Sequence, residues 1–158
     1  MKTIKYSFIL VLVTLLGVSS VSYAQQKTAD EVKKMVESKS FVFKAETANP
    51  VSGGVRQLSP GYDLTITNSS VISYLPFFGR AETIPIGTED GGIKFTSTGF
   101  DYKSASDSKS WQITIKPKDV SHVQQLFLTI YDNGNATLDV MNIHRDNISF
   151  RGYISDAK

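Results

Sequence analysis

Hydrophobic side chains recur at every second residue from Phe41 onward, and this period of two constrains the fold more than any other feature. In the first run Phe41, Phe43 and Ala45 share one face, while Lys44 and Glu46 lie on the other. Such alternation is typical of a β-strand that buries one face. The pattern predicts about nine short strands, at 41–46, 62–67, 71–75, 93–97, 100–105, 111–115, 126–131, 136–141 and 148–154.

Tight turns separate several of these runs. Asn68-Ser69 follows the second run, and Asp132-Asn133-Gly134-Asn135 follows the seventh. An Asn-Gly pair supplies the positive φ angles that a two-residue hairpin requires. We therefore predict a mainly β (α+β) fold, in which a twisted antiparallel sheet forms a partly closed barrel or sandwich and is joined by one N-terminal helix.

Bulky side chains lie on both faces of the last three predicted strands. One face carries Phe127, Tyr131, Met141 and Tyr153. The opposite face carries Leu126, Leu128, Ile130, Leu138, Val140, Ile148 and Phe150. Because large apolar groups are usually buried, we expect the N-terminal helix or a folded-over part of the sheet to cover the first of these faces.

The N-terminal helix is predicted from Thr28 onward. Thr28 and Glu31 have the spacing of a capping box, in which each side chain binds the backbone of the other residue. Val32, Met35 and Val36 follow at positions i, i+3 and i+4, so they form an apolar stripe on a helix of about three turns. We expect this stripe to pack on the domain's own sheet.

The first 24 residues have the pattern of a secretory signal peptide. Lys2 and Lys5 precede an apolar run at 8–18, and small residues end at Ala24. The run is shorter than the roughly 20 residues of a transmembrane helix, and no second candidate follows. We therefore predict a signal peptide at 1–24, a single β-rich domain at 25–158 and no transmembrane anchor after cleavage; an uncleaved anchor helix is the alternative.

Composition excludes several classes of function. The chain has no cysteine, so disulfides, thiolate metal sites and lipid attachment at a cysteine are absent. The predicted signal peptide holds two of the 17 Lys and Arg residues and none of the 15 Asp and Glu residues, so the mature chain has 15 of each sign. A neutral domain without clustered Lys and Arg is not typical of a nucleic-acid-binding protein.

Three aromatic residues, a proline, a glycine and an arginine gather in Tyr74-Leu75-Pro76-Phe77-Phe78-Gly79-Arg80-Ala81. Our candidate ligand-binding residues are Tyr74, Phe77, Phe78 and Arg80, whose rings would stack on an apolar or sugar-like ligand while the guanidinium holds a carboxylate or phosphate. In the structural alternative, Phe77 and Phe78 plug the end of the barrel and Arg80 pairs with Glu82 or binds loop carbonyls.

With this motif in view, the chain resembles domain-of-unknown-function family 4251, small exported proteins of Gram-negative bacteria. The resemblance covers most of the mature chain. It extends through Gly92-Ile93-Lys94-Phe95, Trp111-Gln112-Ile113 and Ile148-Ser149-Phe150-Arg151-Gly152. It implies export to the periplasm or out of the cell and a common fold, but no established activity, substrate or catalytic residue.

Catalytic and metal-binding motifs are missing from the sequence. His122 and His144 are the only histidines, and His144 beside turn aspartates is too little for a zinc site, so we predict no metal, no cofactor and no catalytic residue. The leading hypothesis is a non-catalytic envelope module that binds a small amphiphile, a glycan-like ligand or a protein partner at the 74–81 end. The alternatives are a structural or interaction protein without a pocket, and a hydrolase that uses two carboxylates from Asp63, Glu82, Asp101 and Asp139.

Overall fold

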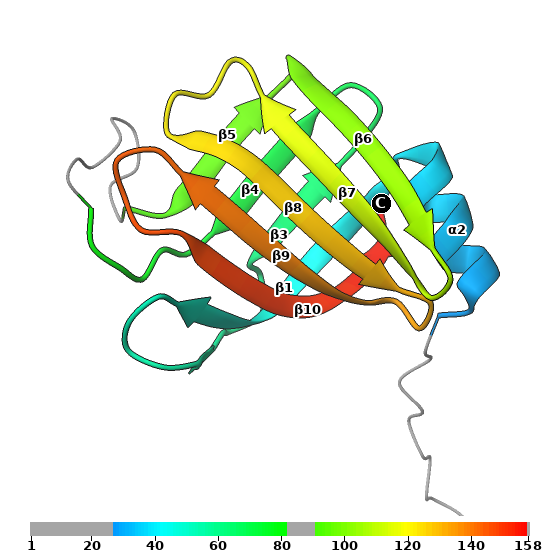
Figure 1. The fold of residues 1–158 in the computed structure, drawn as a ribbon, viewed down its shortest axis with the longest axis horizontal. Coiled ribbons are helices and arrows are strands. Elements are labelled where there is room, and N and C mark those ends of the chain that lie inside the picture. The colour runs from blue at the N-terminus through cyan, green and yellow to red at the C-terminus, as the bar shows by residue number, and fades with distance from the viewer. Residues whose placement is uncertain (1–26, 82–90, 158) are drawn as a thin grey trace, which may run out of the picture.

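The computed structural model describes residues 27–81 and 91–157. This part of the chain contains ten antiparallel strands and one helix, joined by turns and loops. The sheet is curled into a barrel-shaped body (Figure 1). The mainly β fold with a partly closed barrel, predicted from the alternating pattern, is confirmed. The predicted signal peptide at 1–24 and the proposed partner Glu82 lie outside the described residues.

Helix α2 (Ala29–Ser38) begins with the predicted capping box. The backbone N–H of Glu31 donates to Thr28 Oγ1 at 3.4 Å, and the backbone N–H of Thr28 donates to Glu31 Oε2 at 2.8 Å. These bonds supply acceptors for amides that the first turn of a helix leaves without partners. Its apolar stripe of Val32, Met35 and Val36 is buried against the domain's core, as predicted.

The strands agree closely with the predicted runs. Their bounds are β1 (Phe41–Pro50), β2 (Arg56–Gln57), β3 (Asp63–Ile66), β4 (Val71–Leu75), β5 (Ile93–Ser97), β6 (Phe100–Asp107), β7 (Ser110–Pro117), β8 (Val123–Tyr131), β9 (Asn135–Asn142) and β10 (Ile148–Asp156). The strand that the pattern missed is β2, two residues long and set in a loop rich in glycine and proline. A strand of two residues is too short to show alternation.

The sheet has the order β5-β4-β3-β1-β10-β9-β8-β7-β6, and β2 pairs with β1 beside this path. Strand β1 lies in the middle, between β3 and β10. Its register with β10 shifts between Ala45 and Thr47, so Glu46 is an extra residue that forms a β-bulge. Bulges bend a strand and increase its twist, which helps the sheet to curl.

The alternating face that points inward forms one continuous core. Its largest fully buried members include Phe41, Phe43 and Phe150. The expectation that helix α2 or a folded-over sheet covers the face of the last strands that carries Phe127, Tyr131 and Tyr153 is wrong. Phe127, Tyr131 and Tyr153 keep exposed fractions of 39, 46 and 43 %, because this face is the outer surface of the barrel and α2 packs on the inner one.

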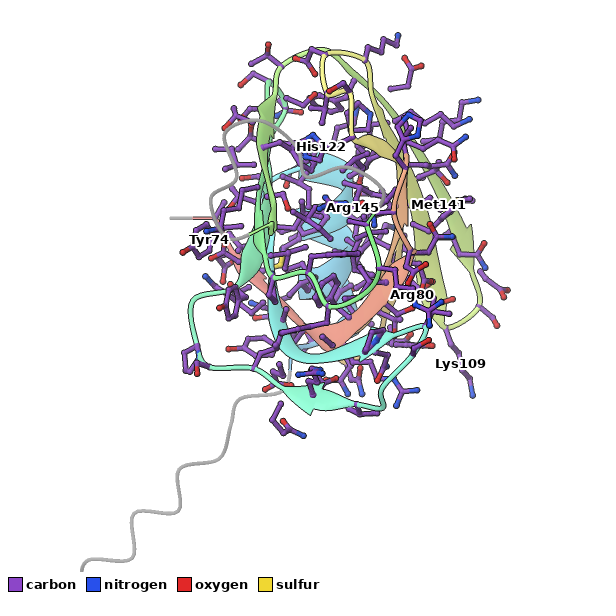
Figure 2. All side chains as sticks on the ribbon, turned by 90° about the vertical axis from the view of Figure 1, so that its left-hand side faces the viewer. Tyr74, Arg80, Lys109, His122, Met141 and Arg145 are labelled. Atoms are coloured by element: carbon purple, nitrogen blue, oxygen red, sulfur yellow. The ribbon has the colours of Figure 1, made fainter. Side chains whose placement is uncertain are left out.

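Helix α2 and the loop between β9 and β10 lie at opposite ends of the barrel (Figure 1). Figure 2 looks into the end where that loop lies, with Arg145 and His122 inside the ring of strands and Tyr74 at its edge. Tyr102 of β6 secures the helix at its own end, since its hydroxyl donates to Val36 O at 3.4 Å. The end facing the viewer in Figure 2 is where the candidate site is found.

Candidate functional site

Two loops meet at the end of the barrel away from α2, one following β4 and the other joining β9 to β10. The backbone N–H of Arg80 donates to Asp146 Oδ2 at 2.9 Å, and the N–H of Asp146 donates to Arg80 O at 3.0 Å. Ala81 and Arg145 form an isolated antiparallel bridge beside them. The curled sheet therefore joins segments that are far apart in the sequence.

Gly79 allows the two loops to approach. A Cβ atom at this position would lie 3.0 Å from Cζ of Phe77 and 3.2 Å from Cβ of Asp146. Both distances are shorter than the roughly 3.5–4.0 Å at which carbon atoms pack. A larger residue would therefore require the side chains of Phe77 and Asp146 to move by a few tenths of an ångström.

Tyr74 and Arg80, two of the four predicted site residues, are exposed. Tyr74 is 48 % exposed on the outer face of β4, where its ring stacks on Tyr62 at 5.8 Å and lies under Nζ of Lys94 at 4.5 Å. Arg80 is exposed and uses its backbone to hold Asp146. The described contacts of Arg80 are therefore those of a loop anchor.

Phe77 and Phe78, the other two predicted residues, are half-buried and pack against the core. Each ring carries a guanidinium group above its face. Arg145 lies 4.6 Å from the ring centre of Phe77, and Arg56 lies 4.8 Å from that of Phe78. The structure thus does not bring the four predicted residues to one point, and it places Arg145 beside Phe77 instead of Arg80.

Arg145 is the most unusual polar residue at this end of the barrel. Its side chain is buried, with 9 % of the residue exposed, and its Nη1 donates to Gly91 O at 2.9 Å. Within residues 27–81 and 91–157, Nε and Nη2 have no hydrogen-bond partner, and no ion pair includes Arg145. Burial lowers the pKa of Arg145 from its ordinary value, yet a guanidinium stays protonated at neutral pH. A buried positive charge thus has two donors available.

His122 lies near this charge. Burial, and then the positive charge of Arg145, lower the pKa of His122, so its imidazole is neutral at physiological pH. Its ring makes an edge contact with Phe95, with ring centres 6.0 Å apart, and Nε2 is buried without a partner in the described structure. A neutral imidazole can either donate or accept a hydrogen bond at this position.

A cavity of about 530 Å³ opens at this place. Its described lining is Arg80, Ala81, His144, Arg145 and Asp146. The volume is in the range of small-molecule sites, which is about 300–1,000 Å³. Asp146 contributes the one carboxylate in this lining, and that carboxylate is bound to the backbone of Arg80.

The carboxylates considered for hydrolysis do not form a pair in the described structure. Asp63 binds Lys44 at 2.7 Å, Asp101 binds Lys118 at 2.6 Å, and Asp139 accepts a hydrogen bond from Ser149. Glu82 is not among the described residues. His144 is exposed, and the described residues contain no group of three or more His, Cys, Asp or Glu side chains that could hold a metal ion.

Sequence reasoning missed Arg145 because its local pattern is that of a surface turn. It lies between two predicted strands, next to His144 and Asp146, where charged residues usually face solvent. His144 adopts a φ of 62°, so the chain turns sharply at this point. No pattern within the sequence shows that such a turn folds into a barrel end.

These observations define a class of protein: a small antiparallel barrel with a helix at one end and a buried, partly unpaired arginine at the other. A family model described as a domain of unknown function, DUF4251, matches residues 23–154, and the chain belongs to this family. None of the curated proteins matches it.

A solved structure supports the fold. The crystal structure of a DUF4251 family protein from Bacteroides eggerthii is similar, with a TM-score of 0.60, 18 % sequence identity, and coverage of 81 % of this chain and 87 % of that one. At this identity the likeness concerns the fold alone. Among the described residues, no helix is long and apolar enough to cross a membrane.

Proposed function

We propose that the protein is a non-catalytic, exported binding module that takes a small organic anion, through a carboxylate or phosphate group, at the barrel end where Arg145 lies. Export is supported by the signal-peptide pattern at 1–24. The binding role is supported by one observation above all, the two guanidinium donors of Arg145 that have no partner in the described structure.

Charge is the first argument for an anion. A buried charge costs several kcal/mol, by order of magnitude, unless it is paired and hydrogen-bonded. The ring of Phe77 and the carbonyl of Gly91 offset part of this cost for Arg145. A bound carboxylate or phosphate would supply the counter-charge that the described residues do not supply.

The geometry of the guanidinium is the second argument. Nε and Nη2 are on the same edge of the group, and their two N–H bonds are parallel. This edge is the one that binds both oxygens of a carboxylate or two oxygens of a phosphate. The two donors without partners are therefore a matched pair for such a group.

The filled core limits what the ligand can be. Phe41, Phe43 and Phe150 fill the barrel interior, so a long apolar tail cannot enter it. The ligand stays at the mouth, in the cavity that Arg80, Arg145 and Asp146 line. A compact anion with a small apolar part satisfies these conditions better than a long-chain amphiphile.

The test is a titration of the mature chain with phenyl phosphate and with benzoate at low chloride concentration. The arginine Nε–H groups are observed in ¹H–¹⁵N spectra, and we expect the signal of Arg145 to shift with saturation. Arg145→Met should weaken binding at least tenfold. Arg56→Met is the matched control, because Arg56 also lies over a phenylalanine ring but is exposed.

Arg80→Ala separates this proposal from the one based on sequence. If Arg145 holds the anion, this change weakens binding much less than Arg145→Met does, because Arg80 lines the same cavity but its side chain is exposed and its charge is screened by water. Equal binding by Arg145→Met and the unchanged protein, or no response to either anion at 20 mM, would reject the proposal.

A further inference from the structure

A second cavity lies on the outer surface along β1. Its volume is about 640 Å³, and its lining includes Lys44, Glu46, Thr47, Gln57, Tyr62 and Tyr153. It shares no lining residue with the cavity at Arg145. The function proposed above does not use it.

The loop that carries β2 forms one wall of this groove, and hydrogen bonds hold it in place. The backbone N–H of Leu58 donates to Glu46 O at 2.9 Å, and the N–H of Ala45 donates to Tyr62 O at 2.9 Å. Thr47 also pairs with Gln57. The bulge at Glu46 lies at the same point of β1 as these bonds.

Two tyrosines stand on opposite sides of β1. Tyr153 is the cross-strand neighbour of Lys44 on β10, and Tyr62 immediately precedes β3 on the other side. Neighbouring strands are about 4.8 Å apart, so β3 and β10 are separated by roughly 10 Å. The two rings line the same cavity on either side of Lys44.

The ring of Tyr62 is held rigidly. It stacks on Tyr74 with ring centres 5.8 Å apart and an angle of 15° between the planes. Tyr153 is 43 % exposed. Tyr74 thus packs against one face of the Tyr62 ring. Because the ring is already ordered, holding it against a ligand costs little conformational entropy.

The polar groups of the groove favour an uncharged partner rich in hydroxyl groups. Lys44 is neutralised by Asp63 at 2.7 Å, which leaves Glu46 as the remaining charge in the lining. The hydroxyl of Thr47 is buried and has no hydrogen-bond partner within the described residues. Gln57 is exposed and offers both a donor and an acceptor.

From these observations we infer that the groove between Tyr62 and Tyr153 is a binding site for a neutral hexose chain. A sugar ring lies between the two tyrosines, its C–H groups against their faces. Its hydroxyl groups bind Thr47 Oγ1, Gln57 and Glu46. An acidic sugar binds less well, because its carboxylate is repelled by Glu46.

The test uses maltohexaose, laminarihexaose and mannohexaose at up to 10 mM, with hexagalacturonate as the charged counterpart. Binding is followed by ¹H–¹⁵N spectra of the mature chain. We expect at least one neutral hexasaccharide to shift the backbone signals of Glu46, Gln57, Tyr62 and Tyr153, and hexagalacturonate to bind at least threefold more weakly.

Variants make the assignment specific. Tyr153→Ala should reduce the affinity at least tenfold, whereas Tyr62→Phe keeps the ring and should change it less than threefold. Tyr131→Ala is the matched control, since Tyr131 is 46 % exposed and does not line the groove. Arg145→Met should bind the sugar normally, so the outcome is independent of the anion site.

The proposal is overturned if none of the three neutral hexasaccharides shifts these signals, if the shifts map to another surface, or if Tyr131→Ala and Tyr153→Ala lose the same affinity. A spectrum of Tyr153→Ala with unchanged dispersion shows that the variant is folded. Should Tyr153→Ala fail to fold, Tyr153→Leu, which keeps an apolar side chain without the ring, replaces it with the same expected tenfold loss.

Discussion

Gly152 of β10 lies so close to the backbone of Lys44 on β1 that the two strands leave no space for a side chain. A Cβ atom at Gly152 would overlap the carbonyl oxygen of Lys44 and lie 2.9 Å from its carbonyl carbon. The contact lies next to the point where the register of β1 with β10 shifts, between Ala45 and Thr47. A glycine and a bulge thus bring two central strands together next to the tyrosine groove.

Gly152→Ala is expected to lower the free energy of unfolding by about 2 kcal/mol or more, because backbone atoms cannot move aside as a flexible side chain can. Urea unfolding measures this difference. Gly99→Ala is the control, since a Cβ atom there meets its nearest neighbours at 3.7 Å. Equal stability of Gly152→Ala and the unchanged protein would mean that β1 and β10 adapt without cost.

Asp119 ties the β5–β6 turn to the β7–β8 loop and gives stability a dependence on pH. The Ser97 hydroxyl donates to it at 2.5 Å, and the backbone N–H groups of Thr98 and Gly99 donate at 2.9 and 3.0 Å. These bonds, the one from Ser97 first, lower the pKa of Asp119 to about 2.

In the unfolded chain an aspartate has a pKa of about 3.9. The ionised carboxylate therefore stabilises the fold fully above about pH 5, and this contribution is lost as the pH falls toward 2. Asp119→Asn should lower the Tm at pH 7, and its difference from the unchanged protein should vanish near pH 2. Thermal unfolding followed by circular dichroism from pH 2 to 7 measures both curves, and a constant difference would contradict the assignment.

Tyr102 makes the stability of the fold depend on pH in the alkaline range, with a sign opposite to that of Asp119. Burial raises the pKa of Tyr102 to about 12. The neutral phenol stabilises the fold fully below the ordinary pKa of about 10, and this stability is lost as the pH rises through 12. Between pH 10 and 12 the Tm of the unchanged protein should fall more steeply with pH than the Tm of Tyr102→Phe. Tyr131→Phe, at an exposed site, should follow the unchanged protein.

Arg145→Met is expected to leave the free energy of unfolding unchanged or to raise it in the absence of ligand, because it removes a buried charge and donors without partners along with one hydrogen bond. Phenyl phosphate should then raise the Tm of the unchanged protein but not that of the variant. Thermal unfolding with and without 10 mM phenyl phosphate measures both effects. A loss of several kcal/mol in the variant would instead indicate that Arg145 holds the barrel end together.

Short-range patterns were sufficient to predict most of the fold. The capping box of Thr28 and Glu31 is formed by neighbours in the sequence, and the alternation in β1 reflects a period that every half-buried strand shares. The hairpin at Gly134 follows from a glycine whose φ is 83°. Each of these features depends on residues a few positions apart, so the sequence by itself determined them.

The two candidate sites depend on how the sheet curls. Arg80 and Asp146 are 66 positions apart, and only closure of the barrel brings their loops together and buries Arg145 beside Phe77. Tyr62 and Tyr153 likewise face one groove only because β1 lies between β3 and β10. A periodic pattern specifies which face of a strand is buried, whereas strand order and curvature decide which distant side chains meet, and these come from the packing of the whole core.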